Sequence, residues 1–357
     1  MSLLIIGGNS IKTDGTKRTL AGFSATKLTG EKWYDIYVKY NGGDKLYANT
    51  FTSNACQGLA EFTSRSADPV ITDISKSEAC MKGSAYLNVW MYVIHELEEA
   101  IEDCQKSVTP STHWDEALAF YTGSTTLVNS TKNYGVFTYG LAEKKCPLFK
   151  TCGVTGADRS LYKSTVNQKV FSLFASGSSY QKAGRCDNLV TTKEALVKQF
   201  TVPLLQGVMQ YLYLSKTLNT EKPKAELWSF ASALLPLISS YSPSVAKMLR
   251  KNAYILNPVT VPDGYMAVKA SLESVYGAMG ISCSDVGGWA DKTTDSGYAS
   301  GMDPCSDNNI VGYVSSSDVT QHLRLDLDQT EMQAFITNKL LLSAYKVYTT
   351  GEAARHA

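Results

Sequence analysis

The sequence predicts a mainly α-helical bundle whose long loops are held by disulfides. Apolar residues recur at helical spacing in several long segments, which is the main signal for amphipathic helices. Eight cysteines are spread along the 357 residues, and stretches rich in Gly, Ser, Thr, Asn and Asp separate the helical patterns. A chain of this length forms one large domain or two modest ones, and both arrangements stay open.

We expect three parts along the chain. Residues 1–82 are rich in small polar residues with only short apolar groups, so they predict an irregular segment with short helices. Residues 83–310 contain the strong helical patterns and form the helical core. Residues 311–357 provide a C-terminal helix that packs on this core.

The helical pattern is strongest over residues 84–106. Trp90, Ile94, Leu97 and Ile101 recur there at helical spacing and predict one long helix. A second helix follows the Thr-Pro-Ser-Thr segment at 109–112.

Thr112 can cap this second helix, and Gly123 closes it. The remaining helices are predicted around 161–176, over 192–218 with a kink or break at Pro203, from Lys224, from Pro243, from Gly264 and over 329–348.

Two tryptophan segments hint at an internal duplication within the core. Trp114 is followed by Asp-Glu-Ala-Leu-Ala, and Trp228 by Ser-Phe-Ala-Ser-Ala, each after a long predicted helix. Two related helical halves packed on each other would explain this similarity.

The cysteines favour export. None of them forms a CxxC pair, so zinc-ribbon and thioredoxin-type motifs are not indicated, and four structural disulfides are expected, with buried free thiols as the alternative. Nearest-neighbour pairing predicts Cys146 with Cys152 and Cys283 with Cys305. The other four are left to pair among themselves in an order that the sequence leaves open: Cys56, Cys80, Cys104 and Cys186. Asn129 begins an N-glycosylation sequon and suggests a glycoprotein.

The composition excludes two classes of partner. Hydrophobic residues make up 44% of the chain, charged residues 19%, and the net charge is +1, so no field attracts a polyanion and no nucleic-acid partner is expected. No apolar run approaches the roughly 20 residues that a membrane-spanning helix needs. The chain has none of the standard catalytic motifs and only four histidines, so we do not expect an enzyme.

Acidic residues are concentrated on the first long helix. Glu96, Glu99 and Asp103 share one face, and His95 and Glu98 share the neighbouring face with Glu102. The first set lies roughly opposite the apolar stripe, where a solvated face is expected, whereas the second set flanks the stripe and reaches inward more easily. Carboxylates this dense repel one another, so the alternative to a solvated face is a face that binds a cation.

The second helix begins with further candidate ligands. His113 and Glu116 are spaced i, i+3 and could bind one ion together. Asp115 and Glu116 also suit the first turn simply because they oppose the positive end of the helix dipole. Tyr121 lies on the core-facing side with Trp114, so packing competes there with a role as a ligand.

Glu226 and Glu273 are isolated acids on otherwise apolar helices. Such an acid lies at an exposed edge or is buried with a partner, and a cation would serve as that partner. Hard ions such as ferric iron prefer carboxylate and phenolate oxygens, and the chain has 21 Tyr against 11 Phe.

Several segments in order carry a resemblance to one known family. NVWMYVIHELEEAIEDC, HWDEALAFYTGS, YGLAEKKC with a following KTCG, NQKVFSLFASG and ESVYGAMGISCSDVGG resemble the algal iron-assimilation proteins. Members of that family are iron-deficiency-induced or high-carbon-dioxide-inducible proteins of the periplasm or cell surface. The resemblance covers roughly Trp33 to Cys305. It implies secretion and a role in iron capture, but no ligand set beyond the acids inside these segments: Glu96, Glu99, Asp103, Asp115, Glu116 and Glu273.

The function expected from these observations is a secreted, non-enzymatic iron-binding protein. It would hold Fe³⁺ or Fe²⁺ through carboxylates, with a His or Tyr, and pass the ion to a membrane transporter. One alternative is a structural cell-surface protein whose Tyr- and Gly-rich loops contact glycans or cell-wall proteins. Another is a metal-dependent hydrolase similar to the helical imelysin-like periplasmic proteins.

Overall fold

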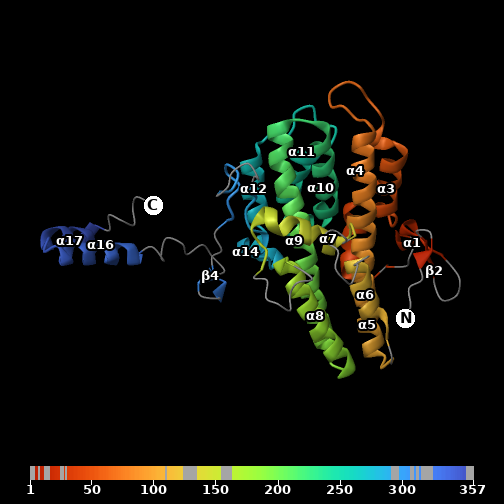
Figure 1. The fold of residues 1–357 in the computed structure, drawn as a ribbon, viewed down its shortest axis with the longest axis horizontal. Coiled ribbons are helices and arrows are strands. Elements are labelled where there is room, and N and C mark those ends of the chain that lie inside the picture. Colours follow the sequence, from red (N-terminus) through yellow and green to blue (C-terminus); the bar gives the residue numbers. More distant parts are fainter. Residues whose placement is uncertain are drawn as a thin grey trace. The chain divides into compact units, whose positions relative to one another are not determined.

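The fold is mainly α-helical, as predicted, in a computed structural model (Figure 1). It describes residues 5–6, 9–11, 17–24, 28, 30–108, 111–123, 135–153, 163–290, 297–305, 309–310, 313–314 and 325–350. The predicted sequon at Asn129 lies outside these residues. Among the described helices, none combines the length and apolarity that a membrane crossing needs.

The chain divides into two compact units, 1–305 and 306–357. The first begins with a small antiparallel sheet and short helices: β1 (Ile5–Ile6), β2 (Asn9–Ile11), β3 (Lys17–Arg18), α1 (Leu20–Ser24), α2 (Lys32–Tyr40), α3 (Tyr47–Gln57) and η1 (Ala60–Phe62). Its main helices follow: α4 (Asp73–Gly83), α5 (Trp90–Gln105), α6 (His113–Thr122), α7 (Thr138–Phe149), α8 (Thr165–Lys182), α9 (Cys186–Leu218), α10 (Glu221–Tyr241) and α11 (Pro243–Ala253). Three short helices complete it: α12 (Tyr265–Glu273), α13 (Tyr276–Met279) and α14 (Cys283–Val286).

The predicted long helix over 84–106 is one part of a longer structure. α4 leads through a π-helical segment, η2 (Ser84–Val89), directly into α5. The helical pattern therefore begins earlier than predicted, within the segment expected to be irregular. α9 and α10 pack against each other, and between them they also contact α4, α5, α7, α8 and α11 (Figure 1).

Two glycines allow close helix packing in this unit. A Cβ on Gly177 would lie 1.9 Å from Cζ2 of Trp114, and one on Gly207 would lie 2.6 Å from the ring of Phe230. Gly177 lies inside α8, which continues to Lys182, whereas the sequence predicted the end of this helix near 176. The indole N–H of Trp114 donates to the carbonyl of Phe174 at 3.0 Å, so α6 is fixed against α8.

Of the kink or break predicted at Pro203, the break does not occur. α9 runs as one helix from Cys186 to Leu218, and Pro203 is buried inside it. The hydroxyl of Thr201 donates to the carbonyl of Val197 at 2.8 Å, as Thr side chains commonly do within helices. Burial of this stretch against the neighbouring helices outweighs the loss of one backbone donor.

All eight cysteines form disulfides, as predicted. Both local pairs are confirmed, Cys146 with Cys152 and Cys283 with Cys305. The two pairs left open are Cys56 with Cys80 and Cys104 with Cys186. The last of these links the end of α5 to the start of α9.

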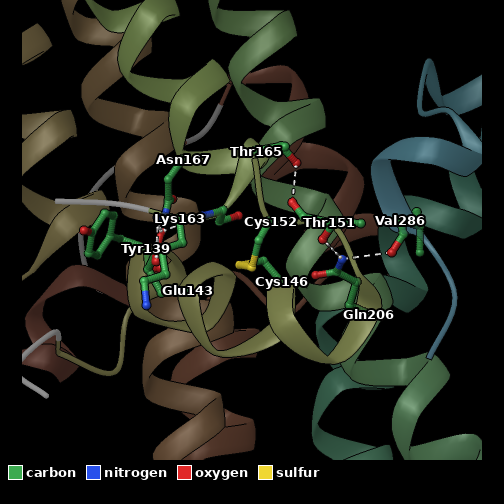
Figure 2. Close-up of a disulfide and its surroundings, with 11 residues drawn as sticks. Tyr139, Glu143, Cys146, Thr151, Cys152, Lys163, Thr165, Asn167, Gln206 and Val286 are labelled. Carbon is green, nitrogen blue, oxygen red and sulfur yellow. Dashed lines mark hydrogen bonds between the residues drawn. A yellow bond between two sulfur atoms is a disulfide. The ribbon is translucent and has the colours of Figure 1, made fainter. Parts of the chain in front are cut away.

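The Cys146–Cys152 bridge lies among buried hydrogen bonds that join α7, α8 and α9 (Figure 2). The carboxylate of Glu143 accepts from the backbone N–H groups of Lys163 and Ser164 and from Nδ2 of Asn167. Nε2 of Gln206 donates to the hydroxyl of Thr151 at 3.2 Å and to the carbonyl of Val286 at 2.9 Å. Glu143 is thus a buried acid whose carboxylate receives its hydrogen bonds from donors of the protein itself.

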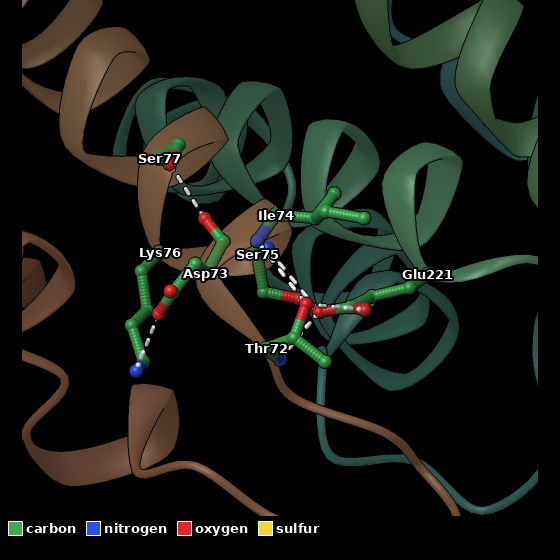
Figure 3. Close-up of polar contacts among 7 residues, drawn as sticks. All are labelled: Thr72, Asp73, Ile74, Ser75, Lys76, Ser77 and Glu221. Carbon is green, nitrogen blue, oxygen red and sulfur yellow. Dashed lines mark hydrogen bonds and ion pairs between the residues drawn. The ribbon is translucent and has the colours of Figure 1, made fainter.

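An acid of α10 caps the start of α4 (Figure 3). The carboxylate of Glu221 accepts from the backbone N–H and hydroxyl of both Thr72 and Ser75, at 2.5 to 3.2 Å. Burial tends to raise the pKa of Glu221, but these hydrogen bonds outweigh it and lower the pKa below its ordinary value. The contact fixes α4, and with it α5, against α10.

The second unit contains β4 (Asn309–Ile310) paired with β5 (Tyr313–Val314), and the helices α16 (Leu325–Thr337) and α17 (Leu341–Thr350). The single helix predicted over 329–348 is therefore two helices that pack on each other. Lys339 adopts a left-handed conformation at the turn, with φ of 60°, although the sequence has neither Gly nor Pro there. The predicted packing of 311–357 on the core and the internal duplication both stay predictions.

Candidate metal site

Three side chains converge beside α5. One carboxylate oxygen each from Glu31 and Glu99 and one ring nitrogen of His95 lie within 4.8 Å of one another. Metal–ligand bonds to such atoms are about 2.0–2.2 Å long, so three ligands spaced equally around one ion lie at most about 3.6 Å from one another. The group would therefore contract by up to about 1 Å to bind one ion.

His95 connects this group to α2. Its Nδ1 lies 2.5 Å from Oε1 of Glu31, the residue that immediately precedes α2. The imidazole is buried and packs beside the ring of Tyr92, with 5.4 Å between the ring centroids. The other oxygen of Glu31, Oε2, is buried and has no hydrogen-bond partner among the described residues. A buried acceptor without a partner loses the free energy of its hydration, and a cation bound to this oxygen would compensate for that loss.

Glu31 is fixed in place by its neighbours along the chain. The buried aromatic face of α2, which includes Trp33 and Tyr37, packs into the core, and the hydroxyl of Tyr37 donates to the carbonyl of Ala233 at 2.6 Å. Nζ of Lys32 lies 2.9 Å from Oε2 of Glu194 on α9. These contacts hold the start of α2 over α5.

The electrostatics of the group favour positive charge. Burial raises the pKa of Glu31, the bond to His95 opposes this, and the like charges of Glu98 and Glu99 raise the pKa further. Burial tends to lower the pKa of His95, but Glu31, Glu96 and Glu99 outweigh it, and the pKa is raised. Both shifts mean that Glu31 and His95 hold protons strongly, and a cation could take their place.

A second acid–histidine contact lies further along α5. Nδ1 of His113 on α6 lies 2.7 Å from Oε2 of Glu96, and its Nε2 lies 3.8 Å from Oδ2 of Asp103. Glu96 is only 2% exposed, so it is not part of the solvated acidic face that the helical pattern favoured. α6 packs on this face of α5 and supplies the histidine that partners the acid.

The structure thus brings together part of the predicted set. His95 and Glu99 meet at one point, and Glu96, Asp103 and His113 at another. Glu98 points to α9, where its Oε1 lies 2.5 Å from Nζ of Lys193.

The other predicted residues contact different partners. Asp115 is exposed, and Oε1 of Glu116 lies 3.4 Å from the hydroxyl of Thr112. Tyr121 is buried, and its hydroxyl donates to Oδ1 of Asn167 at 2.6 Å. Glu226 faces lysines of α4 and α10, and Glu273 pairs with Lys269 on its own helix at 2.6 Å.

Glu31 was not predicted from the sequence. It stands in the segment expected to be irregular, and its one local signal is its position before the apolar group of α2. Its approach to His95 spans 64 residues and depends on how α2 crosses α5. Only the tertiary structure could identify it.

Comparison with known proteins adds no relative. No protein-family model matches the chain, and no curated protein or solved structure shows significant similarity to it.

Proposed function

We propose that this chain is an exported iron-binding protein of the periplasm or cell surface, which assists iron assimilation by holding the ion at Glu31, His95 and Glu99. The convergence of these three side chains, with Oε2 of Glu31 left unpartnered, carries the proposal. Two carboxylates and an imidazole form a donor set that suits iron. In this proposal the protein is a carrier that delivers the ion to a membrane transporter and not an enzyme.

The four disulfides support the proposed location. Disulfides persist in oxidising compartments such as the periplasm and the extracellular space, and are rare where thiols are kept reduced. The bridge from Cys104 to Cys186 also ties the end of α5 to α9 and so supports the helix that supplies His95 and Glu99.

The direct test is the metal content of the intact, disulfide-bonded chain after chelation and reloading with iron. We expect stoichiometric iron in the parent and its loss in the Glu31→Gln, Glu99→Gln double variant. The matched control is Glu102→Gln with Asp115→Asn, because it removes the same charge from exposed positions of α5 and α6.

Either of two results would contradict the proposal. Low iron in the parent would favour the cell-surface interaction protein, and equal loss in both double variants would favour non-specific attraction to acidic residues. Competition with Zn²⁺ and Mn²⁺ under the same chelator then measures the preference for iron.

A further inference from the structure

A polar cavity is lined by residues of α2, α3, η1, η2, α10 and α11. Its volume is about 230 Å³. Drug-sized ligands occupy pockets of about 300–1,000 Å³ and a water about 30 Å³, so this cavity suits a small organic molecule or several waters. It shares no residue with the group at Glu31, His95 and Glu99.

Three residues that line this cavity have buried polar atoms without a partner. The hydroxyl of Tyr47, the indole N–H of Trp228 and the hydroxyl of Ser232 are shielded from solvent and have no hydrogen-bond partner among the described residues. Buried polar groups are nearly always hydrogen-bonded, and each exception calls for an explanation. A ligand in the cavity that supplies the missing bonds would explain these three exceptions.

The cavity also has a guanidinium without an acid. Arg250 lines it from α11, with its guanidinium carbon 5.6 Å from the ring centroids of both Trp228 and Tyr254. In the described part of the chain, this guanidinium has no hydrogen bond or ion pair. Arg250 is an exposed residue whose guanidinium lies beside two aromatic rings, and its N–H donors stay available. An Arg held in this way is suited to bidentate recognition of a carboxylate.

The remaining lining completes a donor and acceptor pattern. Trp228 and Arg250 can only donate, and the hydroxyls of Tyr47 and Ser232 donate or accept. Glu61, which lines the cavity from η1, only accepts when ionised, and within the described part of the chain it forms no ion pair with Arg250. A ligand that matches this pattern has an acidic group for Arg250 and hydroxyl groups for Glu61, Ser232 and Tyr47.

We propose that this cavity binds a small hydroxylated carboxylate of the size of a sugar acid, with the carboxylate at Arg250 and the hydroxyls at Ser232, Tyr47 and Glu61. The ligand is either a free acid or a uronic acid residue at the end of a glycan chain. The site would act independently of metal binding, so either can fail without the other.

Calorimetric titration of the intact chain in the presence of a chelator tests this site. The probes are glucuronate, gluconate, glucose and acetate. We expect glucuronate or gluconate to bind with 1:1 stoichiometry, and glucose and acetate to bind at least about tenfold more weakly, because each lacks one half of the recognised pattern. A glucuronate-terminated oligosaccharide that competes for the same site would identify a glycan end as the source.

Two variants assign the binding to the cavity. Arg250→Gln should weaken glucuronate binding about tenfold or more, and Ser232→Ala about threefold to tenfold. Lys247→Gln is the matched control, since this exposed residue of α11 carries the same charge and does not line the cavity.

Three results would overturn the inference. The first is that neither glucuronate nor gluconate binds. The second is that glucose binds as tightly as glucuronate. The third is that Arg250→Gln and Lys247→Gln weaken glucuronate binding equally. Ser232→Ala guards against misfolding as an explanation, because its hydroxyl has no partner to lose and the variant should unfold at the parent's temperature.

Discussion

Two groups of buried charges in this protein are built in opposite ways. The ion cluster, between α4 and α10, pairs acids with ammonium groups. Nζ of Lys82 contacts Glu78 and lies 3.7 Å from Oε2 of Glu226, and Nζ of Lys222 lies 3.1 Å from Oε1 of Glu78 and 4.0 Å from Oε1 of Glu226. Each acid there has two lysine neighbours.

The second group, the α5 acidic group, consists of Glu31, His95, Glu96, Glu99, Asp103 and His113. Its acids outnumber its histidines, and the partners of Glu31 and Glu96 are histidines, which carry charge only when protonated. The ion cluster therefore neutralises its own acids, whereas the α5 acidic group does not. An external cation would therefore bind at the α5 acidic group, where acids lack permanent positive partners. Glu226 was also a candidate ligand and is buried, but its lysine neighbours already balance its charge.

The largest effect is expected when the ion cluster loses an acid. Glu226→Gln leaves Lys82 beside one carboxylate and removes the charge that favours the buried ammonium of Lys145. Breaking a buried pair from one side costs about 3–5 kcal/mol, so we expect the free energy of unfolding in urea to fall by about that amount. Asp73→Asn, an exposed acid paired with Lys76, should cost about 1 kcal/mol or less. Equal effects of the two variants would contradict the comparison.

The next effect depends on pH and concerns Lys145. Its ammonium is buried beside the stacked rings of Tyr211 and Phe230 and donates to Gln210 at 2.5 Å. Burial lowers its pKa from 10.5 to about 7, which Glu226 opposes and Lys82 and Lys144 reinforce.

Between about pH 7, the pKa of Lys145 in the folded chain, and pH 10.5, its ordinary pKa, the unfolded chain binds more protons than the folded chain. The free energy of unfolding therefore rises with pH across that range. Below about pH 7 the full destabilisation is present. Lys145→Met should therefore stabilise the protein by about 2–4 kcal/mol at pH 6, and this gain should fade as the pH rises from about 7 to 10.5. Unfolding in urea at several pH values measures it, with Lys247→Met at an exposed position of α11 as control. A gain that does not change with pH would refute this account of Lys145.

Much of the fold could be predicted from the sequence. Helical periodicity predicted the long helices, and the even cysteine count predicted four disulfides, including the pairs Cys146–Cys152 and Cys283–Cys305. These features depend on residues near one another in the chain. The continuous helix at Pro203 was missed because tertiary packing outweighed the local signal of the proline. The turn at Lys339 was missed because Lys gives no signal for a left-handed turn.

The candidate site was predictable only in part, for the same reason. His95 and Glu99 were both candidates on the first long helix, but the sequence pattern assigned them to two neighbouring faces, whereas the structure brings them to one point. The burial of Glu96 could not be predicted, since it requires α6 to fold over α5 and place His113 against it. Glu31 is 64 residues from His95 along the chain, and no periodic pattern connects them.

A smaller effect is expected from added metal. A ligand at 100 times its dissociation constant stabilises the folded state by about 2.7 kcal/mol, so iron should raise the unfolding temperature of the chelator-stripped parent. Glu99→Gln should remove most of this gain, because it removes one of the three converging groups. Glu226→Gln should keep the gain despite its lower starting stability. If Glu99→Gln and Glu226→Gln lose the iron-dependent rise in unfolding temperature equally, iron does not bind preferentially to the α5 acidic group.

The smallest effect is expected for Glu31→Gln without metal. The substitution ends the charged contact with His95, which costs stability, but it also removes the repulsion from Glu98 and Glu99 and the burial of a charged carboxylate. These effects oppose each other, so the free energy of unfolding should change by about 1 kcal/mol or less in either direction. The same chemical change at Glu226 is expected to cost about 3–5 kcal/mol, because lysines there lose a partner. A loss at Glu31 as large as the loss at Glu226 would mean that His95 is a permanent cationic partner, and that the α5 acidic group is as self-sufficient as the ion cluster.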